Sequence, residues 1–306
     1  QAAGFERAIG FDMGGTSTDV SRFEGDYELE YETEKAGVRV VSPMMAIETV
    51  AAGGGSICSF DGVRLTVGPA SAGADPGPAC YGRGGPLAVT DMNLMVGRIL
   101  PDQFPFPLDT AIVERQLETL SKQISQASDT DYDPLRLAAG FLRVANNNMA
   151  QAIRSISVAK GYDPRDHVLV TFGGAAPQHA CAVARELGIR QILNHPDASI
   201  LSARGIGLAD VTRHRAVGVY ELYSEDAVAA LQPLQQQLEQ ELTAEVIAEG
   251  ILAEHIEVRH LVDLRYAGLE NSLTIAQSET TTFADSYEQE HQRLYGYNTA
   301  DRSLEI

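Results

Sequence analysis

The stretch Phe11-Asp12-Met13-Gly14-Gly15-Thr16-Ser17-Thr18-Asp19 decides the expected fold of this 306-residue chain. The apolar residues before it predict a short strand over residues 7–12, and residues 19–23 follow as a second strand. Two adjacent glycines let the backbone adopt positive φ values and approach a ligand closely. The stretch therefore predicts a glycine bend inside a β-meander, rather than a strand–loop–helix unit.

The residue types in this bend favour an anionic ligand. The N–H groups of the two glycines can form a nest for phosphate oxygens, and the hydroxyls of Thr16 and Thr18 add donors. Asp12 and Asp19 are suited to hold Mg²⁺ through its waters, because hard cations prefer carboxylate oxygen. A Walker A loop would need Lys before Ser or Thr, followed by a helix, and the bend has neither. The alternative is a tight hairpin whose glycines serve geometry alone.

The composition excludes several classes of protein and partner. Hydrophobic residues make up 44% and charged residues 21%, which argues against a disordered or coiled-coil chain. The formal net charge of −19 argues against nucleic acid or an anionic membrane as a partner. A small anionic ligand remains compatible, because backbone N–H groups bind phosphate without net positive charge.

Three cysteines without a pairing pattern, Cys58, Cys80 and Cys181, indicate a reducing compartment, so we expect a cytoplasmic protein. The chain has no run of 18 apolar residues and no apolar signal-peptide region at its start. A strand pattern begins almost at once and another reaches the last residue. We therefore expect a fragment of a longer polypeptide.

A second glycine turn, Gly173-Gly174, lies in a predicted β-α-β unit. Residues 168–172 and 189–193 read as strands, and the helix between them ends at a glycine, which implies parallel strands in an α/β sheet. A glycine turn at a helix N-terminus favours an anion or the edge of a nucleotide. His179 in the first turn of this helix either faces a cleft as a polariser or acid–base group, or packs at the helix end.

Helices are predicted over residues 109–127 and 134–160. The second has Asp133 as its N-cap, Pro134 in its first turn and a continuous apolar stripe. Asn148 borders this stripe, so its amide either bridges neighbouring backbone or lines a ligand cleft. A further short helix over residues 199–209 is expected to pack through small residues, namely Ala203, Gly205 and Gly207.

Residues 53–86 are rich in glycine and proline. Asp61-Gly62 predicts a hairpin turn between strands over residues 57–60 and 63–67. Residues 68–86 show no regular element, which is typical of a functional loop or a linker. This loop is either a rigid insertion or a surface for another domain or subunit, offered by Asp75, Tyr81 and Arg83. Cys80 within it has no neighbouring base, so we expect a buried structural cysteine.

The character of the chain changes after residue 212. A strand is predicted over residues 213–223 and an amphipathic helix over 225–249, which Pro233 either kinks or starts. A long strand over 256–266 with His260 on its apolar face, a strand near 272–276 and a helix over 282–294 complete the prediction. Residues 1–212 are thus expected to form one domain and residues 213–306 a smaller α+β segment.

Taken together, these motifs resemble the hydantoinase A/5-oxoprolinase family. The resemblance covers roughly residues 8–212, where the motifs occur in family order. They are the stretch from Phe11 to Asp19, Ala52-Gly53-Gly54-Gly55-Ser56, the loop from Gly68-Pro69 to Gly85-Pro86, Thr90-Asp91 and Phe172-Gly173-Gly174. The turn departs from the family pattern at Ala176, where a side chain restricts φ, and at Gln178, which adds a polar group.

The resemblance implies an α/β fold of the actin-like ATPase (ribonuclease-H-like) type, a mixed sheet with a glycine-rich insertion and the smaller C-terminal segment. ATP and Mg²⁺, or Mn²⁺, are the implied cofactors. The implied site assigns Asp12 and Asp19 to the metal and catalysis, Gly14, Gly15, Thr16 and Thr18 to phosphate, and Gly173 and Gly174 to adenosine, with Gly54, Gly55, Asn148 and His179 as candidate cleft residues.

The implied activity is ATP-dependent hydrolysis of a cyclic amide such as 5-oxoproline or a hydantoin, through phosphorylation of the amide oxygen. The implied partners are the cyclic amide itself, a hydantoinase B-type subunit or domain, and an earlier domain with its own Asp-x-Gly-Gly-Thr loop. Because this chain lacks that loop, we expect it to hydrolyse ATP poorly or not at all by itself. A nucleotide-binding subunit of an ATP-dependent ketone carboxylase and a non-catalytic assembly module remain alternatives.

Overall fold

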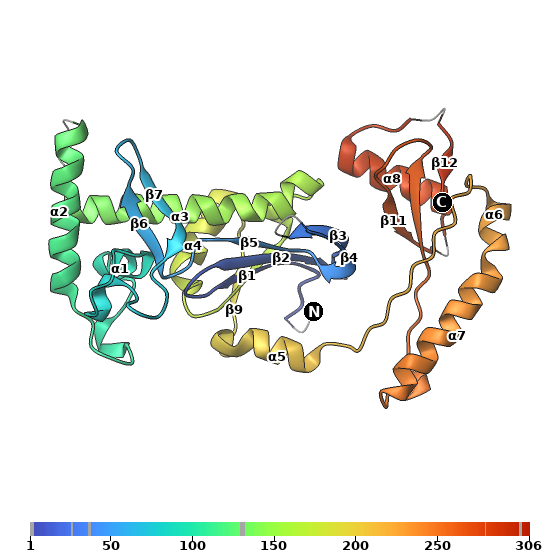
Figure 1. The fold of residues 1–306 in the computed structure, drawn as a ribbon, viewed down its shortest axis with the longest axis horizontal. Helices are drawn as coiled ribbons and strands as arrows, with labels where there is room; N and C mark the ends of the chain where they lie inside the picture. The colour runs from blue at the N-terminus through green and yellow to red at the C-terminus, as the bar shows by residue number, and fades with distance from the viewer. Residues whose placement is uncertain (1–2, 26, 36–37, 129–131, 279, 300–301) are drawn as a thin grey trace. The chain divides into compact units, whose positions relative to one another are not determined.

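The structure, a computed structural model, describes residues 3–25, 27–35, 38–128, 132–278, 280–299 and 302–306 (Figure 1). The chain divides into two compact units, Gln1–Leu208 and Ala209–Ile306. Each unit has its own buried apolar core. No helix of the described residues combines the length and the apolar character that crossing a membrane requires.

A five-stranded mixed sheet organises the first unit, with the strand order β5-β2-β1-β8-β9. Strand β2 pairs antiparallel with both β1 and β5, whereas β8 pairs parallel with both β1 and β9. The bounds are β1 Arg7–Met13, β2 Thr18–Glu24, β5 Ile47–Val50, β8 Val168–Phe172 and β9 Ile192–Asn194. The predicted glycine bend in a meander and the predicted β-α-β unit are both confirmed.

One face of this sheet is apolar and carries the core. Phe11 and Met13 on β1 are fully buried there, because alternate residues of a strand point to the same face. Helix α3 joins this core through its apolar stripe, which includes the buried Phe141 and Ile153, and runs alongside β2 and β5 (Figure 1). The helices of the unit are α1 Val89–Met95, α2 Thr110–Ser128, α3 Pro134–Ile156, α4 Pro177–Leu187 and α5 Leu201–Leu208.

Local signals set several helix ends. The Asp133 carboxylate accepts a hydrogen bond from the Arg136 N–H and caps α3, as predicted. Helix α3 ends at Ile156, short of the predicted residue 160, and a 3-10 turn carries the chain on to Gly161. The 3-10 turns of the chain are Ala79–Tyr81, Pro101–Gln103, Val158–Lys160, Pro164–Asp166, Ala198–Ile200 and Ala253–His255.

Two hairpins lie outside the central sheet. They are β3 Leu29–Lys35 with β4 Val38–Met45, and β6 Ser56–Phe60 with β7 Leu65–Ser71. The predicted turn at Asp61-Gly62 joins β6 to β7. The expectation of no regular element in residues 68–86 is wrong, because β7 extends to Ser71 and a 3-10 turn covers Ala79–Tyr81. The buried Asp91 carboxylate holds this turn by accepting the N–H groups of Ala79 and Cys80.

Helix α5 forms where a helix was predicted, but it does not pack as expected. Ala203, Gly205 and Gly207 are all exposed. A Cβ atom added at either glycine would meet no other heavy atom within 4 Å. The small residues of α5 therefore have no packing partner in the part of the chain that the structure describes.

The second unit combines a three-stranded sheet, ordered β11-β10-β12, with three helices. Tyr266 and Tyr287 lie at its core with their rings edge to face, 5.2 Å between centroids. The bounds are α6 Glu225–Ala230, α7 Gln232–Ala248, β10 Leu261–Tyr266, β11 Leu273–Ala276, α8 Phe283–Tyr295 and β12 Leu304–Glu305.

Three predictions for this unit need correction. Residues 213–223 form no regular strand. In the described chain only residues 220–223 have a backbone partner, residues 304–306, through the Leu222–Glu305 bridge and three backbone hydrogen bonds. The predicted helix is two helices, and Pro233 lies in the first turn of the second. Strand β10 begins at Leu261, so His260 is not a core residue: it is partly exposed, with Nε2 3.5 Å from Glu239.

Candidate functional site

The bend between β1 and β2, residues 14–17, rests on residues 53–55. The N–H groups of Gly54 and Gly55 donate to the carbonyls of Gly14 and Gly15, at 3.0 and 2.6 Å. A Cβ atom at Gly53 would lie within 2.6 Å of three backbone atoms of the bend. Glycine is therefore needed at residue 53 for this close approach. The bend is held from beneath, while its outer side is exposed.

Three of the four backbone donors of this bend have no acceptor among the described residues. Gly14 donates its N–H to the Ser17 carbonyl at 3.0 Å. For the N–H groups of Gly15, Thr16 and Ser17, the described residues provide no hydrogen-bond partner. Since the two neighbouring carbonyls are bonded to the support beneath, three consecutive N–H groups remain for an external acceptor. Such a run of backbone N–H groups forms an anion nest.

Thr18 does not fit the predicted phosphate role. Its side chain is fully buried, and its hydroxyl donates to the Ala52 carbonyl at 2.6 Å. A hydroxyl has one proton to donate, so this bond leaves none for an anion. Thr16 is exposed on the bend, which leaves its hydroxyl accessible.

Asp12 and Asp19 face each other across the β1–β2 ladder. They are direct partners in the antiparallel pairing, so both side chains project from the face opposite the apolar core. Ser202 donates its hydroxyl to Asp12 Oδ2 at 2.8 Å, and Thr49 donates its hydroxyl to Asp19 Oδ1 at 2.7 Å. Each carboxylate is thus oriented by a hydroxyl on one of its oxygens.

This pair fits a hard divalent cation. Like charges directly opposite each other in a sheet repel, and a cation relieves that repulsion. Carboxylate oxygens are the ligands that Mg²⁺ accepts, and it keeps several waters and phosphate oxygens as well. No group of three or more His, Cys, Asp and Glu side chains that could hold a metal occurs within the described ranges. Asp12 and Asp19 are therefore the two carboxylates beside the bend that could share a cation.

The turn at Gly173-Gly174 lies beside the first bend. Ala175 N–H donates to the Met13 carbonyl at 3.1 Å, which ties the turn to the end of β1. Gly173 has φ +79°, and a Cβ atom there would lie 2.4 Å from Asp12 Oδ1. Gly174 is exposed, with open space around it. The fold therefore brings the two glycine motifs together, as the sequence predicts for a shared site.

The candidate cleft residues Gly54 and Gly55 are buried. A Cβ atom at Gly54 would meet Thr90 Oγ1 at 2.9 Å, and one at Gly55 would meet the Gly15 carbonyl at 3.0 Å. The prediction that they line an open cleft is therefore wrong. They form the support beneath the first bend.

His179 is also enclosed rather than facing a cleft. Its side chain is fully buried, with Nε2 2.9 Å from Asn93 Nδ2 and Nδ1 2.7 Å from Asn146 Oδ1. Burial, with a smaller contribution from the Arg98 charge, lowers the pKa of His179 to about 3. A buried neutral imidazole in two hydrogen bonds does not exchange protons with a ligand near pH 7, so the packing alternative fits and the acid–base role does not.

The sequence analysis selected the wrong asparagine and missed two residues. Asn148 is only partly buried, whereas Asn146 and Asn93 are buried and bind the His179 ring. Asn146 lies one helical turn from Leu142 and from Met149, so its place on the apolar stripe was the available signal. Asn93 carried no such signal, because its contact with His179 spans 86 positions.

The glycine-rich loop is organised by a buried carboxylate. Asp91 accepts hydrogen bonds from the N–H groups of Ala79, Cys80 and Ala88, at 3.0, 2.8 and 2.8 Å. Burial raises the pKa of the Cys80 thiol, and the nearby Asp91 raises it further. Cys80 is fully buried and remains a thiol, which agrees with the predicted structural role.

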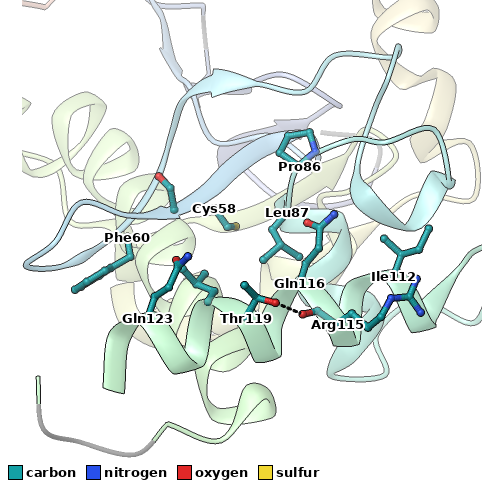
Figure 2. A pocket seen from close by; sticks show the side chains of 11 residues that line it. Cys58, Phe60, Pro86, Leu87, Ile112, Arg115, Gln116, Thr119 and Gln123 are labelled. Carbon is teal, nitrogen blue, oxygen red and sulfur yellow. Dashed lines mark hydrogen bonds between the residues drawn. The ribbon is translucent and has the colours of Figure 1, made fainter. Parts of the chain in front are cut away.

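A separate pocket of about 600 Å³ lies between β6 and α2. Figure 2 shows Cys58 and Phe60 on the strand side, and Arg115, Gln116, Thr119 and Gln123 on the helix side. The Thr119 hydroxyl donates to the Arg115 carbonyl within α2. None of the residues of the two glycine motifs lines this pocket.

Comparison with known proteins relates the chain to 5-oxoprolinases and to a caprolactamase subunit. 5-Oxoprolinase 1 of Arabidopsis thaliana is 39% identical over 97% of this chain, and 5-oxoprolinase of Saccharomyces cerevisiae is 40% identical over 97%. The chain spans 25% and 24% of these two relatives, about a quarter of their length. The caprolactamase subunit alpha of Pseudomonas jessenii is 30% identical over the whole chain, which covers 46% of that relative.

Solved structures show the same fold. The ATP-dependent caprolactamase from Pseudomonas jessenii matches all of this chain and 46% of its own chain, with a TM-score of 0.86 and 29% identity. A nucleotide-free acetone carboxylase matches with a TM-score of 0.69 and 22% identity over the same shares, a likeness in fold alone. The family model described as hydantoinase/oxoprolinase matches residues 1–215. The chain therefore belongs to the hydantoinase/oxoprolinase family.

Proposed function

We propose that this chain is the ATP-binding part of an enzyme that hydrolyses a cyclic amide. The observation that carries the proposal is the first bend: three consecutive N–H groups, for which the described residues offer no acceptor, lie beside a carboxylate pair and a second glycine turn. In this assignment Gly14, Gly15, Thr16 and Ser17 hold the polyphosphate. Gly173 and Gly174 are assigned to the adenosine: Gly174 has open space where a side chain would stand, and Gly173 lets the turn approach Asp12 closely.

Asp12 and Asp19 are the residues that would hold Mg²⁺ or Mn²⁺ in this assignment. The bound ion would supply positive charge that offsets the charge of the phosphates. Ser202 and Thr49 hold the two carboxylates in place before nucleotide arrives. The bend supplies fixed donors, so the site needs little rearrangement when phosphate charge develops.

The proposed reaction proceeds in two steps. The amide oxygen of the ring attacks the γ-phosphorus of ATP, the bond to the bridging oxygen breaks, and ADP leaves. The second step consumes two waters. One attacks the activated ring carbon, the carbon–nitrogen bond breaks as the nitrogen takes a proton, and an acyl phosphate remains; the other hydrolyses that acyl phosphate, which releases phosphate and leaves the open-chain amino acid. Phosphorylation is needed because an amide carbon is a poor electrophile. The names of the relatives, 5-oxoprolinases and an ATP-dependent caprolactamase, support a lactam as the ring.

Two further parts of the proposal follow from the family. The mixed sheet, with its glycine bend between the first two strands, is proposed to be an actin-like (ribonuclease-H-like) nucleotide-binding sheet. Because the chain spans a quarter of its 5-oxoprolinase relatives, a facing domain with a second phosphate loop and a hydantoinase B-type subunit or domain are proposed to complete the site. A cytoplasmic location stays a prediction from the unpaired cysteines.

The test is ADP release by the full-length protein, with any partner subunit, in the presence of Mg·ATP. We expect release to depend on a lactam such as 5-oxoproline, caprolactam or a hydantoin, and to fall sharply in Asp12→Asn. Release that depends instead on a ketone with bicarbonate would favour the carboxylase alternative. If neither the unaltered full-length protein nor Asp12→Asn binds nucleotide, the result would favour the non-catalytic assembly module.

A further inference from the structure

Helix α1 contacts the support of the first bend. Thr90, in its first turn, donates both its N–H and its hydroxyl to the Gly54 carbonyl, each at 2.8 Å. Gly54 in turn donates its own N–H to the Gly14 carbonyl at 3.0 Å. One residue of α1 is therefore two hydrogen bonds away from the first bend.

One turn further along, the same helix contacts the helix that follows the second glycine turn. Asn93 bonds to the His179 ring in α4, and the ring bonds to Asn146 in α3. The exposed fractions of Asn93, Asn146 and His179 are 1%, 6% and 0%. Arg98 donates to Asn93 Oδ1 at 3.4 Å and to the Gln178 carbonyl at 2.9 Å. The start of α4 is thus held by side chains from two other helices.

The proton positions in this cluster follow from its donors. Arg98 can only donate, so Asn93 turns its oxygen toward Arg98 and its NH₂ toward His179. The Nε2 atom of His179 therefore accepts, and Nδ1 carries the proton and donates to Asn146 Oδ1. The hydrogen bonds that link Asn93, His179 and Asn146 are therefore all satisfied in one arrangement, which favours a single packing of α1, α3 and α4.

We propose that α1 is a brace between the two glycine motifs, and that Thr90, Asn93, Asn146 and His179 are positioning residues that fix residues 173–174 relative to residues 14–17. The path runs from Gly14 through Gly54 to Thr90, along one turn of α1 to Asn93, and through His179 to the start of α4. The brace itself does not depend on the ligand. Its consequence, a correctly spaced nucleotide site, rests on the proposed function.

Hydrogen exchange of backbone amides tests the brace without any ligand. His179→Asn retains a donor near the position of Nδ1 and removes the acceptor for Asn93. We expect exchange to be about tenfold faster both for the hydrogen-bonded amides that hold the first bend, Gly14, Gly54 and Gly55, and in residues 172–178, because unpairing a buried polar group destabilises its surroundings. Asn146→Ala should do the same, and Asn147→Ala on the exposed face of the same helix should not.

A second pair of variants covers the other half of the path. Thr90→Val removes the hydroxyl at constant shape and should accelerate exchange of the Gly14, Gly54 and Gly55 amides, while Thr90→Ser should match the unaltered protein. Faster exchange confined to α4, or spread evenly over the first unit, would overturn the brace.

Titration of the full-length protein with Mg·ATP separates the brace from the proposed function. With both correct, His179→Asn weakens binding about tenfold, while the secondary structure measured by circular dichroism stays unchanged. If the unaltered protein binds no nucleotide, but His179→Asn accelerates exchange at both glycine motifs, the proposed function fails and the brace stands. If it binds nucleotide and His179→Asn binds equally well with unchanged exchange, the brace fails.

Discussion

Two hairpin bends of the first unit contain glycine beside acidic residues, yet they differ in whether a side chain accepts their backbone N–H groups. In the β6–β7 bend, residues 61–64, Asp61 Oδ1 accepts the N–H groups of Val63 and Arg64, each at 2.9 Å. In the β1–β2 bend, residues 14–17, no side chain occupies the corresponding N–H groups in the part of the chain that is described. The acidic residues there stand in the strands instead, as Asp12 and Asp19.

The difference shows what makes a glycine bend a candidate anion site. An acidic residue at the first position of a bend satisfies the donors internally, as Asx turns do. A glycine at that position leaves them open, and the carbonyl contacts from Gly54 and Gly55 keep the bend in shape without using those donors. The availability of N–H groups, rather than the presence of glycine, therefore separates the two bends.

The largest effect is expected from making the first bend resemble the second. Gly14→Asp places a carboxylate where it can accept the N–H groups of Thr16 and Ser17, as Asp61 does two and three residues ahead of itself. The nearest obstacle to a Cβ atom there lies 4.0 Å away, so the variant should fold. We expect Mg·ATP affinity to fall about 100-fold or more, because charge-assisted hydrogen bonds are lost and like charges repel.

Calorimetric titration measures this change, with Gly14→Ala as the control for adding a side chain. If the Mg·ATP affinity of Gly14→Asp lies within threefold of that of Gly14→Ala, the open N–H groups of the first bend do not bind the phosphates.

A smaller loss is expected when the support of the first bend is altered. In Gly53→Ala the new Cβ atom would lie 2.5 to 2.6 Å from backbone atoms of Thr16 and Ser17, so the bend must shift. Overpacking of this kind costs about 1–3 kcal/mol of stability, and we expect about tenfold weaker nucleotide binding. The matched control is Gly62→Ala in the second bend, where the backbone is strained at φ +99° but the Cβ atom meets nothing.

Thermal unfolding and nucleotide titration of both variants check this prediction. Gly62→Ala should lower the melting temperature while leaving nucleotide affinity unchanged. Equal losses of affinity in the two variants would show that general destabilisation, not the shape of the first bend, governs binding.

The carboxylates of the two bends should also differ. Asp12→Asn removes half of the charge pair beside the first bend, and we expect Mg·ATP affinity to fall about tenfold because the cation loses a ligand. In excess EDTA the same variant should bind ATP no more weakly than the unaltered protein, since one repulsive charge is gone. Asp61→Asn serves as the control and should change neither value. A loss of affinity in Asp12→Asn that persists in EDTA would contradict the metal role.

Acid should loosen the first bend before the second. The depressed pKa of His179, about 3, means that the unfolded chain binds one more proton than the folded protein between about pH 6.5 and 3. The contribution of His179 to the free energy of unfolding is fully present above about pH 6.5. It falls by up to about 1.4 kcal/mol per pH unit as the pH decreases through that range. Backbone hydrogen bonds from Arg64 and Val63 lower the pKa of Asp61, so the second bend keeps its cap until below about pH 3.8.

Denaturant unfolding at pH 7, 5 and 4 checks the acid response. His179→Gln should unfold with a shallower pH dependence than the unaltered protein. Burial also lowers the pKa of His167, so His167→Gln serves as the comparison that isolates each histidine. An unchanged slope in His179→Gln would contradict the neutral, enclosed state of its ring.

Much of the fold was predictable because its signals are local. The glycine bend, the Asp133 cap and the glycine that ends α4 each depend on residues close in sequence, and all three are confirmed. The errors concern long-range packing. In the described chain only the last four residues of the predicted strand 213–223 pair, with residues 304–306 more than 80 positions away, and the partners of His179 lie 33 and 86 positions away. The hydrogen bond of the Thr18 hydroxyl was equally unpredictable from sequence, since its acceptor, the Ala52 carbonyl, is 34 positions away.

The most direct test is a crystal structure of the full-length protein grown with Mg²⁺ and a non-hydrolysable ATP analogue. The account predicts phosphate oxygens within hydrogen-bond distance of the N–H groups of Gly15, Thr16 and Ser17, with the cation on the side of Asp12 and Asp19. A nucleotide bound elsewhere, with these N–H groups facing only water, would contradict it.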